Sequence, residues 1–310
     1  MGEWSKKLGE HGEDVVAAFM NMIGWKAPLT GIDLDCYKGP AHSQGTAPRR
    51  SHGVDFLFPC VSPLEDEVLK HLLVSSKYSS NAYPASPGNK FKDYFLDLAM
   101  ALECYRRSTQ KKMINSGYQG ISAEQIAGVL FWINDEDPSD MDVVRKIAGS
   151  KGIDDLNYNT IYVVDNYRAS FLYESITYTR SRYGSENVRF LYPSTGRNIS
   201  PSTRMTSGTV LPPEYLNSGI IPFVVQQNGV KSLTICCQDN FSSEALSRLV
   251  GFSISIGSEF PGKIEISFAD YSFAKHDQDV GLVKALISNK EVAQTVEVTR
   301  YSQDFRSISQ

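Results

Sequence analysis

The sequence Val54-Asp55-Phe56-Leu57-Phe58 is an apolar run interrupted by one acid, and Leu72-Leu73-Val74-Ser75-Ser76-Lys77-Tyr78 is a second run that carries a lysine near its end. Both runs have the length and composition of buried β-strands. A lone charge in a buried strand costs several kcal/mol of folding free energy unless a partner compensates it. Asp55 and Lys77 therefore either neutralise each other or share a metal ion and a phosphate, and the two strands alone leave both possibilities open.

The composition of the 310-residue chain narrows the class of protein. Hydrophobic residues make up 41% of it, enough for one large domain or two modest ones. The net charge of −4 argues against a general nucleic-acid coat or a polybasic membrane binder, but it is compatible with a nuclease that has a local basic groove. The first twenty residues lack the apolar segment of a signal peptide, and no apolar run reaches the roughly 18 residues of a spanning helix. We therefore expect a cytoplasmic protein without membrane contact.

The cysteines give no framework for a disulfide or a zinc site. Five of them are scattered along the chain without a C-x-x-C spacing, at Cys36, Cys60, Cys104, Cys236 and Cys237. Each lies in an apolar segment, so reduced and buried thiols are expected. The five histidines are equally scattered, and the sequence does not predict a zinc site made of Cys and His.

The order of the predicted elements indicates an α/β fold. Hydrophobic spacing predicts a helix at 9–23, a strand at 31–37, a loop at 38–52, the two charged strands, a loop at 79–89 and a long helix from 91 to about 115. Strands at 128–133, 160–164 and 187–192 then alternate with helices at 140–148 and 168–183. This alternation predicts a mixed sheet flanked by helices on both faces.

A polar run at 193–207 is the predicted domain boundary, which gives one domain at 1–205 and a second at 206–310. The second domain reads as a strand-rich α+β region. Its predicted strands lie at 220–226, 231–237, 252–256 and 263–268, and its predicted helix at 242–250. We expect this domain to be a partner or oligomer interface, with the apolar run 220–225 as an exposed edge strand.

Three charged residues are expected to converge in the first domain. Helical periodicity places Glu13 at the edge of the apolar face of the first helix, where it looks toward the sheet. Alternation places Asp55 on one face of its strand, and Ser75 together with Lys77 on one face of the next. A turn centred between residues 65 and 66 would set Asp55 opposite Ser76.

Carboxylates and an ammonium group are what phosphodiester hydrolysis needs. Carboxylate oxygens hold a hard divalent cation such as Mg²⁺, which keeps several of its waters. The cation lowers the pKa of a bound water and neutralises charge on the scissile phosphate. A nearby ammonium orients the attacking water or stabilises the transition state. The structural alternatives are a cross-strand ion pair for Asp55 and Lys77, and an ordinary rim carboxylate for Glu13.

These residues resemble the PD-(D/E)XK nuclease superfamily. The similarity lies in Gly9-Glu10-His11-Gly12-Glu13, in His52-Gly53-Val54-Asp55 and in Leu73-Val74-Ser75-Ser76-Lys77, which follow a Glu…Asp…(Glu/Gln/Ser)-x-Lys signature. More narrowly, the chain is similar to the nuclease subunit of a two-gene bacterial anti-phage defence system, which forms a complex with a partner protein. The motifs cover about the first quarter of the chain, and the part after Ser207 shows no such resemblance.

The resemblance implies a fold, a metal and a set of roles. The core would be restriction-endonuclease-like, with Asp55 as the central metal ligand and the Ser76 carbonyl as a second. Lys77 would be the catalytic lysine, and Glu13 would bind the metal or its water. The metal would be Mg²⁺, for which Mn²⁺ can substitute. The implied function is hydrolysis of double-stranded DNA by the effector subunit of a defence complex, assembled as a homo- or hetero-oligomer.

One position departs from the superfamily pattern. Ser75 stands where most members carry Glu, and a neutral hydroxyl is a poorer ligand for Mg²⁺ than a carboxylate. We therefore expect weaker metal binding, with Glu13, Asp33 and Asp35 as candidates to supply the missing charge. The departure also leaves open a catalytically degenerate DNA-binding or scaffold subunit, and the sequence leaves open RNA as the substrate.

Basic side chains indicate where nucleic acid would bind. Two lie in the loop at 38–52 and four near the end of the long helix, at Arg49, Arg50, Arg106, Arg107, Lys111 and Lys112. The helix cluster is the densest basic spot in the sequence. It either contacts phosphates or forms a solvated face that complements the helix dipole.

Overall fold

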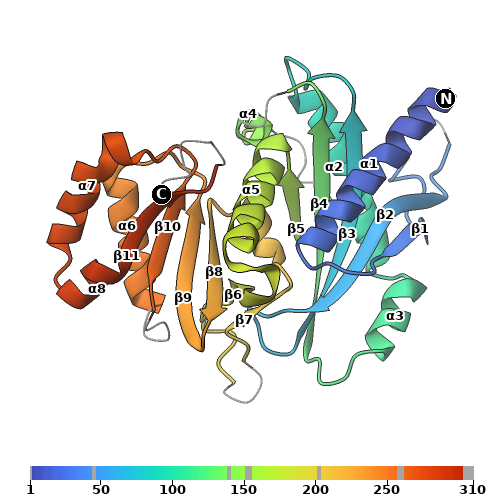
Figure 1. The fold of residues 1–310 in the computed structure, drawn as a ribbon. Helices are drawn as coiled ribbons and strands as arrows, with labels where there is room; N and C mark the ends of the chain where they lie inside the picture. Colours follow the sequence, from blue (N-terminus) through green and yellow to red (C-terminus); the bar gives the residue numbers. More distant parts are fainter. Residues whose placement is uncertain are drawn as a thin grey trace. The chain divides into compact units, whose positions relative to one another are not determined.

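The computed structural model describes residues 2–43, 47–137, 141–150, 156–200, 204–256 and 262–302. The chain divides into two compact units, each built on one mixed β-sheet (Figure 1). Unit 1 comprises Met1–Ser170, Gly196–Thr203 and Pro212–Asn217, and unit 2 comprises Phe171–Thr195, Arg204–Leu211 and Ser218–Gln310. Among the helices of these described ranges, none is both long and apolar enough to cross a membrane.

The two units do not follow the predicted boundary after residue 205. Residues 171–195 cluster with unit 2, whereas 196–203 and 212–217 return to unit 1. Ion pairs hold the returning segments within unit 1, because Arg197 contacts Glu65 at 2.8 Å and Glu214 contacts the buried Lys70. The domain limits 1–205 and 206–310 stay a prediction.

The sheet of unit 1 has the strand order β1-β2-β3-β4-β5. Its strands are β1 Leu29–Asp35, β2 Ser51–Val61, β3 Val68–Ser79, β4 Ala123–Asn134 and β5 Thr160–Val164. The first three form an antiparallel meander, and β4 and β5 continue the sheet parallel to β3. The predicted restriction-endonuclease-like core with a mixed sheet is confirmed.

Helices cover both faces of this sheet. The α-helices of the described residues that lie wholly in unit 1 are α1 Glu3–Met22, α2 Gly88–Tyr105, α3 Thr109–Ser116 and α4 Val143–Ile147. Helix α1 crosses β2 and β3 on the near face, and α2 lies behind the sheet (Figure 1). Strand alternation explains the division, since Phe131 of β4 contacts Phe19 of α1 while the next residue, Trp132, contacts Phe91 of α2.

The single long helix predicted from 91 to about 115 is wrong. Helix α2 ends at Tyr105, and α3 begins after Ser108. The Ser108 side chain accepts a hydrogen bond from the Lys111 backbone N–H at 3.1 Å, which satisfies one of the free donors of a new helix. A serine cap therefore divides the segment, so that Arg106 and Arg107 lie in the turn after α2 while Lys111 and Lys112 lie in α3.

The predicted register of β2 and β3 is wrong by one residue. Phe56 lies opposite Val74, and Leu57 lies opposite Leu73. Residues directly opposite each other in an antiparallel pair share a face, so this register brings Leu57 and Leu73, both fully buried, together in the core. The connection contains Glu67 at φ 58°, so it is not the symmetric turn on which the prediction rested.

Unit 2 contains a six-stranded sheet of order β11-β10-β9-β8-β6-β7. Its elements are the end of α5 Asn166–Tyr183, η1 Ser185–Asn187, β6 Val188–Leu191, β7 Ser207–Gly208, β8 Ile220–Gln227, β9 Val230–Cys237, α6 Ser243–Ile256, β10 Ile264–Phe268, α7 Phe273–Leu286, α8 Lys290–Thr295 and β11 Val296–Arg300. A further short helix, η2 Pro213–Asn217, belongs to unit 1. Apolar side chains of α6, α7 and α8 pack on one face of the sheet, and Thr179 of α5 contacts Cys236 on the other.

Two predictions for unit 2 are wrong. Residues 252–256, predicted as a strand, are the end of α6, because β9 and β10 are parallel and need a crossover between them. Residues 220–225, predicted as an exposed edge, belong to β8, which lies between β9 and β6 and is buried from Ile221 to Val225. An uninterrupted apolar run is typical of such an interior strand.

Candidate active site

Strands β2 and β3 separate at Asp55. Their ladder ends with the pair Phe56–Val74, whereas β3 continues to pair with β4 as far as Ser79. Beyond the last pair, the Ser76 backbone N–H donates to the Asp55 carboxylate at 2.6 Å. The aspartate side chain thus takes the place of a ladder carbonyl. We call this place, formed by Asp55 and residues 75–77, the fork.

The neighbouring strand β1 is also irregular beside the fork. The pairs of β1 and β2 on either side of Asp55 are Thr30–Phe56 and Ile32–Val54. Between them lies Gly31 at φ 58°, a left-handed conformation that glycine adopts without strain. Asp55 therefore lies outside the regular ladder toward both β1 and β3.

Gly12 allows α1 to approach the fork. A Cβ atom at this position would lie 2.3 Å from the Cβ atom of Tyr78 and 3.5 Å from the Ser76 Oγ. Any larger residue would therefore push the helix away from β3. Gly9, one turn earlier, has no heavy atom within 4 Å of such a Cβ, so only Gly12 has a steric reason to be glycine.

Glu13 follows Gly12 at the rim of the fork. Its side chain is exposed rather than turned inward as predicted. Its pKa is nevertheless raised, first by partial desolvation and next by the charge of Asp55, while Lys77 acts in the opposite direction. The structure thus brings Glu13, Asp55 and Lys77 into one electrostatic neighbourhood.

Lys77 is half-buried on the α2 side of the sheet. Its Nζ atom lies 5.7 Å from the centre of the Tyr94 ring. The Nζ atom of Lys90 lies 4.9 Å from the centre of the same ring. Within the described residues, neither Lys77 nor Asp55 has an ion-pair partner closer than 4.0 Å. The cross-strand ion pair considered from the sequence therefore does not form, and both groups remain available for other partners.

The two serines of the fork have different environments. Ser75 is 8% exposed, and it replaces the usual carboxylate of the superfamily pattern at a buried position. The Ser76 Oγ lies on the α1 side, buried and without a hydrogen-bond partner among the described residues. Asp55 is therefore the one acidic side chain of the fork, and Glu13 at its rim is the neighbouring acid that can supply the charge that Ser75 lacks.

Asp33 and Asp35 do not join the fork. Both are exposed on β1, opposite Gly53 and Ser51. Neither is among the charges that shift the pKa of Glu13. They lie opposite the start of β2, before Asp55, and this placement does not support them as replacements for the missing carboxylate.

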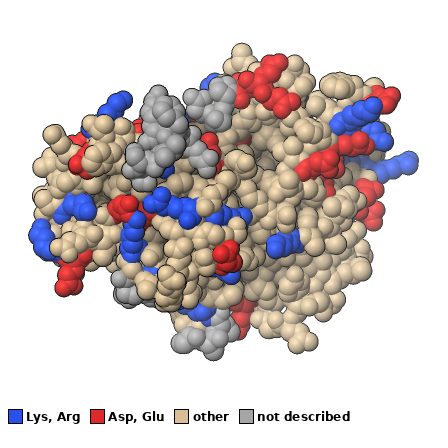
Figure 2. Space-filling view, viewed as in Figure 1, with Lys and Arg blue, Asp and Glu red and all other residues tan. Residues whose placement is uncertain are grey.

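Most of the predicted nucleic-acid-binding residues have structural partners. Arg49 pairs with Asp97 at 2.7 Å, and Lys111 pairs with Glu124 at 2.6 Å. Arg106 donates to Asn159 at 2.8 Å, Arg107 stacks on Tyr37 at 4.7 Å, and Arg50 and Lys112 are exposed. In the part of unit 1 seen in Figure 2, basic and acidic side chains are interspersed. A DNA-binding surface built from these six residues stays a prediction.

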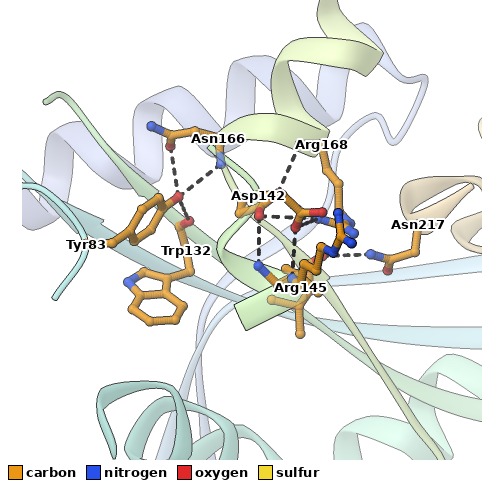
Figure 3. A network of polar contacts seen from close by, with 10 residues as sticks. Tyr83, Trp132, Asp142, Arg145, Asn166, Arg168 and Asn217 are labelled. Carbon is orange, nitrogen blue, oxygen red and sulfur yellow. Dashed lines mark hydrogen bonds and ion pairs between the residues drawn. The ribbon is translucent and has the colours of Figure 1, made fainter. Parts of the chain in front are cut away.

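The sequence interpretation missed a polar network at the ends of β4 and β5 (Figure 3). Arg168 contacts Asp142 at 2.8 Å and the buried Asp165 at 3.3 Å. Asn166 accepts a hydrogen bond from the Asn134 backbone N–H and bonds the Tyr83 hydroxyl. These groups satisfy one another and anchor the start of α5, so the network is structural.

A second missed group lies in unit 2, where Glu265 is buried on β10. Its carboxylate accepts hydrogen bonds from the Tyr178 and Tyr183 hydroxyls and lies 3.4 Å from Arg182. An adjoining cavity of about 420 Å³ is lined in part by Arg182, Lys263 and Glu265. Because the carboxylate is fully partnered, this arrangement offers no free acid or base, and the fork is the stronger candidate.

The comparison with known families agrees with this geometry. A family model described as the GAPS4 protein PD-(D/E)XK nuclease domain matches residues 1–168. The chain belongs to this family. The match includes α1 and all five strands of the first sheet, and it confirms the resemblance to a PD-(D/E)XK nuclease of a defence system.

Membership of the GAPS4 family shows the general class of activity of this domain, a nuclease, which implies a nucleic acid as its substrate. PD-(D/E)XK nucleases depend generally on divalent metal ions. Neither the curated proteins nor the solved structures gave a match to the chain.

Proposed function

We propose that this chain is a metal-dependent nuclease that hydrolyses phosphodiester bonds of double-stranded DNA, with Glu13, Asp55, Ser76 and Lys77 as its active site. The observation that carries the proposal is that these groups lie close together at the fork. There the charge of Asp55 raises the pKa of Glu13 and the charge of Lys77 lowers it. Membership of a defence-system nuclease family supports the same reaction class.

The donor set of the fork fits Mg²⁺ or Mn²⁺. Two carboxylates that repel each other favour a cation between them, and their oxygens are the hard ligands that these ions prefer. Asp55, Glu13 and the Ser76 carbonyl would hold the ion. When bound, it supplies a water of lowered pKa and neutralises charge on the phosphate.

The remaining roles follow from how each side chain is held. The hydrogen bond from the Ser76 N–H fixes the orientation of the Asp55 carboxylate. Among the described residues, no carboxylate lies within ion-pair distance of Lys77, so its ammonium can reach a substrate phosphate and the attacking water. Glu13 stands at the solvent side, where it can orient a water.

The test is DNA cleavage by the purified chain, alone and with its partner subunit, in Mg²⁺ or Mn²⁺. Asp55→Asn keeps an acceptor for the Ser76 N–H but removes the charge, so we expect cleavage to be lost with little change in melting temperature. Asp97→Asn, which removes the partner of Arg49, is the control and should retain cleavage. Activity surviving in Asp55→Asn would refute the site, and cleavage of RNA alone would refute the substrate.

A second candidate function rests on Ser75. The missing carboxylate favours a degenerate nuclease fold that binds DNA or serves as a scaffold in a complex. Calorimetric titration with Mn²⁺ separates the two functions. Uptake of Mn²⁺ in the presence of DNA supports the nuclease, and the lack of any uptake supports the degenerate subunit.

We also propose that the chain works with a second defence-system subunit, bound through unit 2. The family match ends at residue 168, and unit 2 has its own sheet and core beyond it. Native mass spectrometry of the chain with its neighbouring gene product tests this. We expect a stable complex that is lost when residues 218–310, which follow the last segment of unit 1, are deleted, while a complex that persists in that variant would place the interface elsewhere.

A further inference from the structure

Four potential metal ligands meet in unit 1, away from the fork. Cys36 directly follows β1, His42 lies in the loop after it, His52 lies in β2, and Cys104 is near the end of α2. One ligand atom of each lies within 4.8 Å of the corresponding atom of every other. His42 and His52 are fully buried, Cys104 is 2% exposed and Cys36 is half-buried.

The separations of these atoms are those of a tetrahedral site. With zinc–sulfur bonds of about 2.3 Å and zinc–nitrogen bonds of about 2.05 Å, a tetrahedron places its sulfurs about 3.8 Å apart and its nitrogens about 3.3 Å apart. The Sγ atoms of Cys36 and Cys104 are 3.9 Å apart, and the His42 Nδ1 and His52 Nε2 atoms are 3.3 Å apart. The observed distances therefore leave room for one ion of this size at the centre.

The mixed pairs of His42 agree as well. A tetrahedral zinc site has sulfur–nitrogen separations of about 3.6 Å. The His42 Nδ1 atom lies 3.4 Å from the Cys36 Sγ and 3.5 Å from the Cys104 Sγ. The ligand atom of His52 lies within 4.8 Å of both sulfurs, so four ligand atoms from distant parts of the sequence gather around one point.

A buried carboxylate orients His42. The Nε2 atom of His42 lies 2.8 Å from Glu103, whose other carboxylate oxygen pairs with Lys38 at 2.6 Å. With Nε2 as the donor to Glu103, Nδ1 carries a lone pair that points at the two sulfurs and at His52. Histidines that bind zinc commonly have such a carboxylate partner on the other ring nitrogen.

We propose that Cys36, His42, His52 and Cys104 bind one Zn²⁺ as a structural site. Two thiolates and two imidazoles form a soft donor set that suits Zn²⁺ and is unlike the oxygen ligands that Mg²⁺ prefers. All four positions are taken by protein, which leaves none for a substrate or a catalytic water. The site is therefore closed and distinct from the fork.

The zinc ties four segments of unit 1 together. It joins the end of β1, the loop after it and the end of α2 to His52, which lies three residues before Asp55 on β2. The structural role rests on the four ligands alone, so it holds with or without nuclease activity at the fork.

The experiment measures metal content rather than activity. The full chain is purified without chelator, and its zinc is determined by inductively coupled plasma mass spectrometry, with one zinc per chain expected. Cys104→Ser and Cys36→Ser should lose the zinc and lower the melting temperature by roughly 5–15 °C. Cys60→Ser is the matched control, because Cys60 is half-buried like Cys36 but lies outside the cluster, and it should keep one zinc.

Cobalt substitution makes the test independent of how well the variants fold. Replacement of zinc by Co²⁺ in the unmodified chain should give the visible bands of tetrahedral cobalt and a near-ultraviolet thiolate-to-cobalt band. Zinc-free protein of unchanged melting temperature would overturn the proposal, as would octahedral cobalt spectra. A disulfide between Cys36 and Cys104 in freshly purified protein, seen as a mass lower by two hydrogens, would also overturn it.

Discussion

His52 and Asp55 lie three residues apart on β2, in surroundings that differ in every property that governs metal binding. The His52 cluster is buried, soft in its donor atoms and closed by four protein ligands. The fork around Asp55 is partly open to solvent, hard in its donor atoms and short of one carboxylate because of Ser75. One strand thus carries a site suited to a permanent ion at its start and a site suited to an exchangeable ion further along.

The difference shows how one sheet can carry a metal site that stabilises the fold and, apart from it, a metal site that is open to substrate. A closed site gains stability because every ligand is held by a different segment, and it cannot admit a substrate. An open site keeps positions for water and phosphate, so it binds its ion more weakly. Four experiments can break or sharpen this comparison.

Metal removal should have the largest effect. Brief dialysis against EDTA, followed by transfer to metal-free buffer, should abolish DNA cleavage, because the ion at the fork exchanges readily. Added Mg²⁺ should restore cleavage while the zinc content stays at one per chain throughout. Loss of zinc in parallel with loss of cleavage would show that the two sites are not separable in this way.

Lys77→Ala should lower the cleavage rate by about 10²–10³-fold, the usual effect of removing a group that stabilises transition-state charge. Lys90→Ala is the matched control, since its ammonium lies near the same Tyr94 ring but on the exposed start of α2. Its rate should stay within a few-fold of the unmodified chain. Equal losses in both variants would remove Lys77 from the active site.

Gly12→Ala should destabilise the fold by about 1–3 kcal/mol, because a methyl group at this position overlaps Tyr78. Gly9→Ala on the same helix meets nothing and should stabilise it by about 0.5–1 kcal/mol through helix propensity. Urea unfolding measures both values. We also expect Gly12→Ala alone to lower cleavage, since it moves Glu13 from the fork, and unchanged cleavage would contradict this role for Gly12.

Glu13→Gln should have the smallest effect on stability, with a sign that depends on pH. The raised pKa means that the charged carboxylate is disfavoured in the folded state. Stability linked to this group is present below the ordinary glutamate pKa and is lost as the pH rises through the raised value. In metal-free buffer the variant should therefore melt slightly above the unmodified chain at pH 7–8 and not at pH 4.

Glu3→Gln on the same helix is the control for this small shift, because Glu3 pairs with exposed Lys7 and is not among the charges that raise the pKa of Glu13. It should show no gain in melting temperature at neutral pH. Added Mg²⁺ should raise the melting temperature of the unmodified chain more than that of Glu13→Gln. The same response in both chains would place Glu13 outside the metal site.

The sequence by itself determined the residues of the fork and the class of the fold, because both depend on local rules. Alternation along a strand and helical periodicity are short-range properties, and they predicted the mixed sheet correctly. The resemblance of the motifs around Glu13, Asp55 and Lys77 predicted the family. Local rules predicted helix ends and registers less well. Ser108 caps a new helix and so divides the predicted long helix in two, and the turn at Glu67 goes with a register of β2 and β3 that is shifted by one residue.

Only the tertiary structure decided which distant residues meet. Cys36 and Cys104 are separated by two strands and a helix, and they come together because β1 pairs with β2 while α2 packs on the same sheet. No spacing in the sequence encodes that contact, so the four ligands looked like scattered buried thiols and histidines. Asp33 and Asp35 show the converse. They lie on the strand that pairs with the strand of Asp55, but the register of β1 and β2 places them opposite Gly53 and Ser51 rather than opposite Asp55. Local patterns follow from backbone geometry, whereas a site built from separate segments exists only once the whole sheet has formed.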